Sequence, residues 1–170
     1  MAKIKLDSKD RLILLGQFRI LEKIDPDNKG DYQRAAKIIE YGYESYYDSI
    51  GGPILDPVTE QVCEEVHNIL EMYRWLGQSY DGLADKSGID AHDVKFRGFD
   101  GNNETDHLCF GEFLTSEGKY EESPVFNSHS QVIEMYRRML KEFEQVKNEY
   151  PLGKADIQRI LAAMIHPSRR

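Results

Sequence analysis

The 170-residue sequence has few of the features that mark membrane, secreted or disulfide-bonded proteins. It contains no uncharged apolar run near the roughly 18 residues that a membrane span requires. Its first ten residues include lysines but no apolar stretch or small-residue cleavage site, so we expect no signal peptide and a cytoplasmic protein. Two cysteines, Cys63 and Cys109, are too few for a disulfide framework, and their apolar neighbours predict that both are buried.

Positive charge is also scarce. Lysine and arginine number 22 against 30 aspartate and glutamate residues, which gives a formal net charge of −8. Nucleic acids and anionic membranes repel such a chain, so we expect neither as a general partner. With 40% hydrophobic and 31% charged residues, the composition is that of a soluble globular protein and not of a disordered one.

Familiar catalytic motifs are missing as well. The sequence has no Gly-x-Ser-x-Gly, no phosphate-binding glycine loop and no His-Glu-x-x-His. Residues 25–36 imitate half of a calcium loop, but Ala36 stands where the glutamate of the twelfth position should be. Nothing in the sequence therefore argues for catalysis, and we expect no cofactor.

What the sequence does have is helical periodicity. Capping residues and apolar spacing predict six helices, over about 8–24, 29–49, 57–82, 103–117, 128–146 and 154–165. The middle segment, 83–103, is irregular, and Val94–Arg97 alternates as a short strand or an extended loop does. The prediction is an all-α fold in one compact, bundle-like domain over residues 1–170, with a possible subdivision near 82–102.

Three of the predicted helices carry specific expectations. Residues 8–24 place large apolar side chains on most faces, which predicts a helix that is buried on most sides. Asp56 and Pro57 are the expected N-cap and first residue of the third helix. Ser128 and Gln131 form a predicted capping box for the fifth.

Four tyrosines crowd the end of the second helix and occupy more than one of its faces. Tyrosine combines a large contact area with a polar hydroxyl, so the cluster suits either a core layer that reaches the boundary or a subunit interface. Together with the two-heptad apolar stripes of the third and fifth helices, it favours a homo-oligomer, dimeric or larger. The interface candidates are Tyr41, Tyr43, Tyr46 and Tyr47.

Two Glu-x-x-His segments offer an alternative, a helical di-metal enzyme. Residues at i and i+3 lie on one helix face, and carboxylate-bridged di-metal bundles use this spacing on two helices. Five histidines in a glutamate-rich chain also produce such pairs by chance, so we favour solvated or interfacial histidines and expect no metal. The alternative ligands are Glu64, His67, Glu104 and His107.

A nucleic-acid-binding regulator is a second alternative. Residues 83–97 have the spacing of a helix-turn-helix, with Ala84 allowing close helix approach and Gly88 making the turn. Acidic residues would face the phosphates, and only Lys95 and Arg97 would attract them, which weighs against DNA binding.

The leading interpretation is a self-associating helical protein that binds a protein partner or a small ligand. Loops between helices hold functional residues more often than packed stripes do. The first candidates for a ligand site are therefore the polar residues around the irregular middle segment: Arg97, Asp100, Asn102 and Glu104.

Short motifs occur in a characteristic order along nearly the whole chain. They are Arg11–Leu14 with Gln17, Asp25-Pro26, Tyr32, Ile39-Glu40, Gly42-Tyr43, Glu71–Tyr73, Gly98–Asp100 with Glu104, Glu117-Gly118 and Tyr136–Leu140. This set resembles the YfbU-like family of bacterial proteins. The resemblance implies a helical, cytoplasmic protein, and it supplies no established activity, cofactor or catalytic residue.

Overall fold

The computed structural model describes residues 4–51, 56–166 and 168. Over these residues the fold is all-α, with six α-helices, two short 3-10 helices and no strand, which confirms the predicted fold class. None of the described helices combines the length and the hydropathy that a membrane span needs. The chain divides into two compact units, Met1–Pro57 and Val58–Arg170. The segment 82–102 lies inside the second unit, and a single domain over residues 1–170 stays a prediction.

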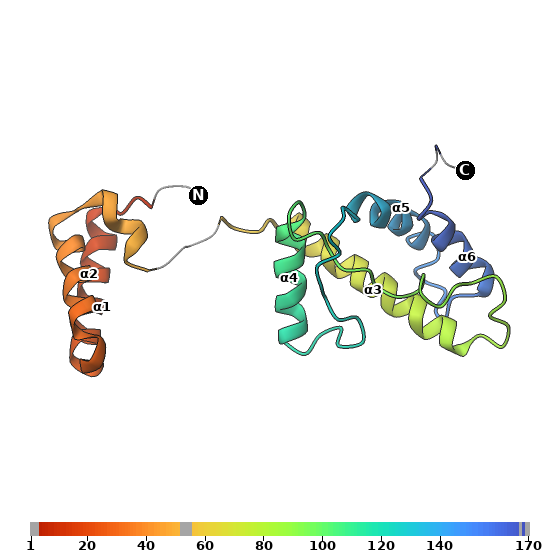
Figure 1. Cartoon of the computed structure of the whole chain (residues 1–170), viewed down its shortest axis with the longest axis horizontal. Coiled ribbons are helices and arrows are strands. Elements are labelled where there is room, and N and C mark those ends of the chain that lie inside the picture. The colour runs from red at the N-terminus through yellow and green to blue at the C-terminus, as the bar shows by residue number, and fades with distance from the viewer. Residues whose placement is uncertain (1–3, 52–55, 167, 169–170) are drawn as a thin grey trace. The chain divides into compact units, whose positions relative to one another are not determined.

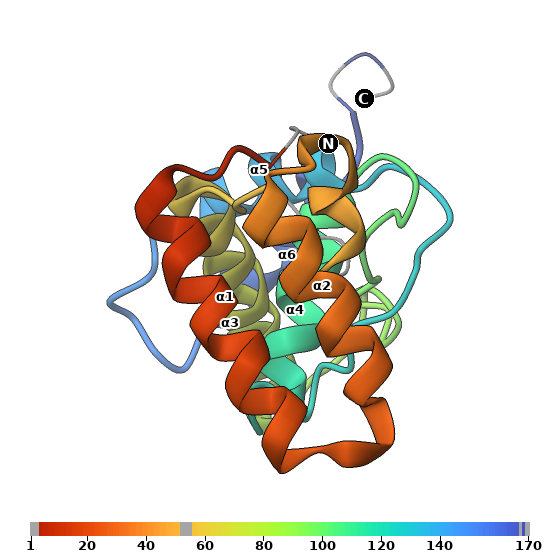
Figure 2. The ribbon, with the colours of Figure 1, turned by 90° about the vertical axis from the view of Figure 1, so that its left-hand side faces the viewer.

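The N-terminal unit is an antiparallel helical hairpin (Figures 1 and 2). The first helix begins at a capping box, in which the Asp7 carboxylate accepts hydrogen bonds from the backbone of Lys9 and Asp10. The second helix ends at Gly42, whose φ of 70° is the left-handed conformation that glycine adopts readily. The helix predicted over 29–49 is therefore shorter, and its last part is a 3-10 helix. The elements are α1 (Ser8–Ile24), η1 (Pro26–Asn28), α2 (Lys29–Tyr41) and η2 (Glu44–Ser49).

The first helix is less buried than its sequence predicts. None of the α1 residues is buried, so the expectation of a helix buried on most sides is wrong. The reason is that α1 has two opposite apolar faces and, within this unit, only α2 and η1 to pack against. The packed face carries Leu14, Leu15 and Phe18, and the open face carries Leu12, Ile13, Ile20 and Ile24, which are 72%, 51%, 61% and 70% exposed.

The tyrosine cluster divides between the core and the surface of the hairpin. Tyr47 is buried in the small core of the unit, whereas Tyr41, Tyr43 and Tyr46 are exposed. The rings of Tyr41 and Tyr43 stack, with their centroids 5.7 Å apart. Arg11 of α1 donates to two carbonyls in the last turn of α2, so the exposed tyrosines lie at the same end of the hairpin as the start of α1.

The C-terminal unit is built around its longest helix, α3, against which the three later helices pack (Figure 1). The α3 helix begins three residues later than predicted, at Glu60 and not at Pro57, because the Thr59 hydroxyl, and not Asp56, accepts the Val62 N–H as the N-cap. The elements are α3 (Glu60–Gly82), α4 (Thr105–Ser116), α5 (Ile133–Phe143) and α6 (Lys154–Ala162).

Four aromatic rings form the centre of the C-terminal unit. All four are buried, and the contacting pairs have ring centroids 5.1 to 5.9 Å apart. Tyr73 comes from α3 and Tyr136 from α5, whereas Phe96 and Phe99 come from the irregular segment. The core of this unit therefore includes a segment that is neither helix nor strand.

The irregular segment is held through its backbone. The Tyr136 hydroxyl donates to the Gly98 carbonyl at 2.9 Å and accepts the Arg97 N–H at 3.3 Å. Val94–Arg97 forms no strand, and a single bridge between Phe99 and Asn127 is the only strand-like pairing in the described residues. Val94 lies in a turn and Lys95 in a bend, so the alternating pattern of Val94–Arg97 appears as alternating burial and not as an extended backbone.

The cysteines differ from their prediction. Cys63 is partly buried, and Cys109 is exposed, so the expectation of two buried thiols is wrong for Cys109. The reason is the orientation of α4, which buries Gly111 and Leu114 and leaves Cys109 and Phe113 open.

The Tyr136 hydroxyl gives a stability test. We expect Tyr136→Phe to lower the free energy of unfolding by about 1–3 kcal/mol, because the Gly98 carbonyl and the Arg97 N–H lose their partner. Urea unfolding followed by the fluorescence of Trp75, the only tryptophan, measures the change in this unit.

Tyr73→Phe is the matched control. The Tyr73 hydroxyl makes a long contact of 3.7 Å with the Met139 sulfur and interacts with the Tyr136 hydroxyl, but it bonds to no backbone group in the described residues, so its removal should change the free energy of unfolding by less than about 1 kcal/mol. Equal losses in the two variants would contradict the role given to Tyr136.

Candidate functional site

A pocket of about 1150 Å³ lies along α3 in the C-terminal unit. One side is α3 itself, and the others are residues 91, 92 and 94–97 of the irregular segment and residues 122–124 and 126 of the loop that follows α4. Four aromatic side chains belong to its lining: Tyr73, Tyr80, Phe96 and Phe126. A concave site with aromatic walls and a few polar groups is the usual form of a small-molecule site.

Charged side chains of both signs line the pocket. Arg74 donates to the Glu122 carboxylate, which lowers the pKa of Glu122 and keeps it ionised. The Arg74 guanidinium also lies 4.3 Å from the centroid of the Tyr120 ring. Arg97 forms an ion pair with Asp93, four residues earlier in the sequence. The side chain of Lys95 has no hydrogen bond or ion pair within the described part of the chain.

Only one of the four first candidates lines this pocket, namely Arg97. Asp100 belongs to a buried turn, where hydrogen bonds from the Asn103 amide (2.6 Å) and the Asn102 N–H (3.0 Å) lower its pKa. The Asn102 side chain is exposed outside the pocket. The remaining candidate, Glu104, has a structural position.

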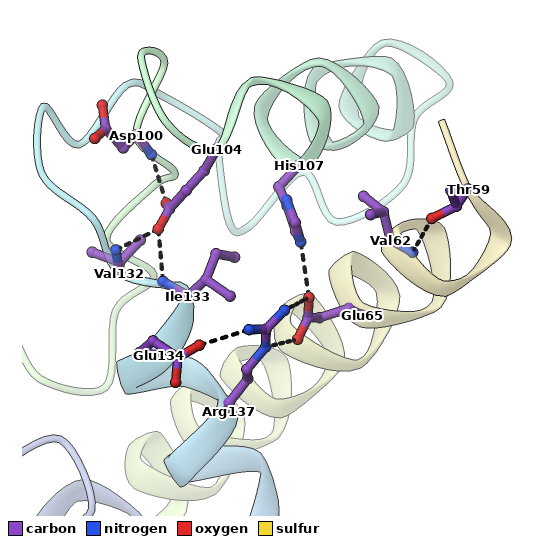
Figure 3. Close-up of polar contacts among 10 residues, drawn as sticks. All are labelled: Thr59, Val62, Glu65, Asp100, Glu104, His107, Val132, Ile133, Glu134 and Arg137. Atoms are coloured by element: carbon purple, nitrogen blue, oxygen red, sulfur yellow. Dashed lines mark hydrogen bonds and ion pairs between the residues drawn. The ribbon is translucent and has the colours of Figure 1, made fainter. Parts of the chain in front are cut away.

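Glu104 holds three backbone groups together (Figure 3). Its Oε1 accepts the N–H groups of Val132 at 2.7 Å and Ile133 at 2.9 Å, and its Oε2 accepts the Asp100 N–H at 2.8 Å. Since Val132 and Ile133 begin α5, the buried carboxylate caps that helix, where the helix dipole favours a negative charge.

The capping box predicted for this helix is wrong. Ser128 donates to the Ser130 carbonyl inside its own turn, and α5 begins only at Ile133. A cap from a residue 28 positions away has replaced the local one.

The two Glu-x-x-His pairs do not form a common site. Glu64 is exposed, and Glu104 is occupied with the backbone. The Nδ1 atom of His67 lies 3.3 Å from the Tyr120 hydroxyl, and the Nε2 atom of His107 lies 2.9 Å from Glu65. In the parts of the chain that the structure describes, no three His, Cys, Asp or Glu side chains are placed to hold a metal ion.

Glu65 is the polar centre that the sequence reasoning missed (Figure 3). It joins three helices, because its carboxylate accepts from His107 of α4 and, at 2.6 Å and 3.0 Å, from Arg137 of α5. Burial raises the pKa of Glu65, but the hydrogen bonds from Arg137 and His107 outweigh it, so the pKa lies below 4.5. The spacing of Glu65 in the sequence could have revealed this role. It is three residues from Val62 and four from Ile69, which places a charged side chain on the apolar face of the helix.

Residues 83–97 form no helix-turn-helix. The segment that follows α3 contains no helix before α4, so there is no recognition helix at these positions.

The sequence matches a known family over most of its length. The sequence profile of the YfbU domain matches residues 4–163, which include parts of both units. The chain belongs to the YfbU family.

Several relatives of this YfbU protein align over nearly its full length. They include UPF0304 proteins of Mannheimia succiniciproducens, Histophilus somni and Pasteurella multocida, which are 33%, 34% and 33% identical to it over 165 residues. Each match covers 94% of this chain and 100% of the relative. The names of these relatives state no activity.

The Glu104 cap leads to a second stability test. We expect Glu104→Gln to lower the free energy of unfolding by about 2–3 kcal/mol, because the amide offers one acceptor oxygen where the carboxylate offers two, and because the charge at the α5 terminus is lost. The exposed Glu64→Gln makes the same chemical change and should stay within about 0.5 kcal/mol of the wild type in urea unfolding. Similar values for both variants would show that the cap contributes nothing.

The lowered pKa of Glu65 predicts that the stability of the fold depends on pH. Because its folded pKa is lowered, the ionised carboxylate stabilises the fold above the unfolded value of 4.5, and this stabilisation disappears as the pH falls through the folded pKa. We expect Glu65→Gln to be less stable than the wild type by about 1–2 kcal/mol near neutral pH, and the difference to shrink at acidic pH.

Urea unfolding at a series of pH values measures this difference. Glu134→Gln is the control, since Glu134 also pairs with Arg137 but its side chain is 79% exposed, and its removal should have little effect at any pH. A Glu65→Gln difference that stays constant from neutral to acidic pH would contradict the prediction.

Proposed function

We propose that this YfbU protein is a self-associating helical protein of the bacterial cytoplasm, and that it binds a small ligand instead of catalysing a reaction. The observation that carries the self-association is the second apolar face of α1. Leu12, Ile20 and Ile24 are each more than half exposed on a helix whose opposite face already packs on α2.

The open face of α1 has the composition of a subunit interface. Its four aliphatic side chains are between 51% and 72% exposed, and three exposed tyrosines at one end of the hairpin add further apolar surface. Tyrosine is enriched in such interfaces. Gly16 lies within the stripe with no atom within 4 Å of the position its Cβ would take, which leaves room for close approach of another helix.

The hairpin also needs a partner for its own stability. Its buried apolar residues are few, and two short helices with so small a core are marginal in water. A second hairpin of the same kind supplies an identical apolar face. Two hairpins related by a two-fold axis then make a four-helix layer in which each α1 is covered on both faces.

The exposed thiol supports the compartment that we propose. Cys109 is unpaired and open to solvent, and such thiols persist in reducing compartments. The pocket along α3 supports the binding of a small ligand, and a protein partner in place of a second copy is a distinct outcome of the test below.

A charged residue on the open face of α1 tests whether this face is the subunit interface. We expect the wild-type chain to sediment as a dimer or larger oligomer at tens of micromolar, and Ile20→Glu to raise the dissociation constant at least about 100-fold, because a carboxylate would be buried in an apolar interface. Analytical ultracentrifugation measures both species.

Lys37→Glu is the control on α2, where an exposed charged side chain is exchanged and no apolar surface is lost. It should leave the oligomer intact. A monomeric wild type would overturn the self-association, and an oligomeric Ile20→Glu chain would exclude this face as its interface. Trp75 fluorescence tests whether the C-terminal unit stays folded in both variants.

A further inference from the structure

We propose that the pocket along α3 binds a planar aromatic molecule that carries an acidic group. The inference rests on the proposed role in ligand binding and names the chemical class of the ligand. It draws on the shape of the aromatic walls, on the way they are fixed and on the charges around them.

The walls of the pocket offer flat apolar surfaces at two depths. Phe96 and Tyr73 are buried and belong to the aromatic core, so they form a rigid floor. Phe126 is 47% exposed although it is large and apolar, and its ring centroid lies 6.4 Å from that of Phe96. The two rings meet edge to face, at an interplanar angle of 64°, so they form one apolar wall, and a planar ring laid against this wall removes apolar surface from water.

The wall that carries Phe126 is fixed before any ligand arrives. The Phe99 N–H donates to the Phe126 carbonyl at 3.0 Å. Gly98, with a φ of 80°, lies so close to this loop that a Cβ would be 2.2 Å from the same carbonyl oxygen. A preformed site loses little conformational entropy on binding, so a small rigid ligand can bind without first ordering this wall.

Among the cations that line the pocket, Lys95 is the one without a polar partner in the described residues, since Arg74 is paired with Glu122 and Arg97 with Asp93. The lining contains these three cations and two carboxylates, in a chain whose net charge is −8. One of these carboxylates, Glu122, is already bonded to Arg74.

Lys95 and Arg97 are the contacts that we assign to the acidic group. They flank buried Phe96, both side chains are exposed, and both line the pocket. The Arg97 partner, Asp93, is outside the lining of this pocket, and the Lys95 side chain has no polar partner in the described residues. A neutral ligand that covered Lys95 would leave an ammonium group without its water, which selects for a ligand with a negative charge.

The test compares 2-naphthoate with 2-naphthamide, which has the same shape and no charge. Isothermal titration calorimetry with the full-length protein should give a dissociation constant at least about tenfold lower for the acid than for the amide. Lys95→Gln should weaken naphthoate binding by about 3- to 10-fold and leave the amide unchanged, whereas Phe126→Ala should weaken both compounds. Lys141→Gln, an exposed lysine on α5, should change neither.

Three outcomes would overturn the proposal: no binding of either compound at millimolar concentration, equal affinities for both, or no response of naphthoate binding to Lys95→Gln. The result is separable from the self-association, because Ile20→Glu leaves the pocket residues untouched and should bind naphthoate as the wild type does. If the wild type is a monomer that binds naphthoate, the ligand proposal stands and the self-association is refuted. If the wild type is an oligomer that binds neither compound, the self-association stands and the ligand proposal is refuted.

Discussion

The buried carboxylate of Glu104 connects parts of the C-terminal unit that the sequence keeps far apart. It stands at the start of α4, it binds the first N–H groups of α5, and it holds the turn at Asp100. A buried carboxylate is stable only when its oxygens are satisfied, and three backbone donors satisfy this one. The spacing between the two helices and the end of the irregular segment therefore depend on one side chain.

The shape of the pocket depends on the contacts that hold the irregular segment in place. The irregular segment is bound at one end by Glu104 and in its middle by the Tyr136 hydroxyl, and Gly98 lets the loop of Phe126 approach it closely. The segment thus acts as a rigid wall although it has no regular secondary structure. Charged side chains can project from such a wall into solvent, because its backbone and its alternate side chains are already anchored in the aromatic core.

The sequence predicts local structure well and distant partners poorly. Apolar periodicity gave the positions of the six helices, and loop reasoning led to Arg97. Sequence patterns could not show that Glu104 caps α5 or that Glu65 joins three helices, because the groups that bind these two carboxylates are distant from them in sequence. The apolar faces of α1 were visible too, but periodicity reports only that a face is apolar, and not which molecule covers it.

The two-faced α1 helix has a consequence for the lifetime of the chain in the cell. In the oligomer that we propose, α1 is covered on its second face only after assembly, so part of its stability comes from mass action and rises with protein concentration. At low abundance the hairpin opens more often, and proteases cleave opened segments faster than folded ones. Single chains that have not yet assembled are then degraded first. The protein therefore accumulates only when it is made fast enough to reach the concentration at which it assembles.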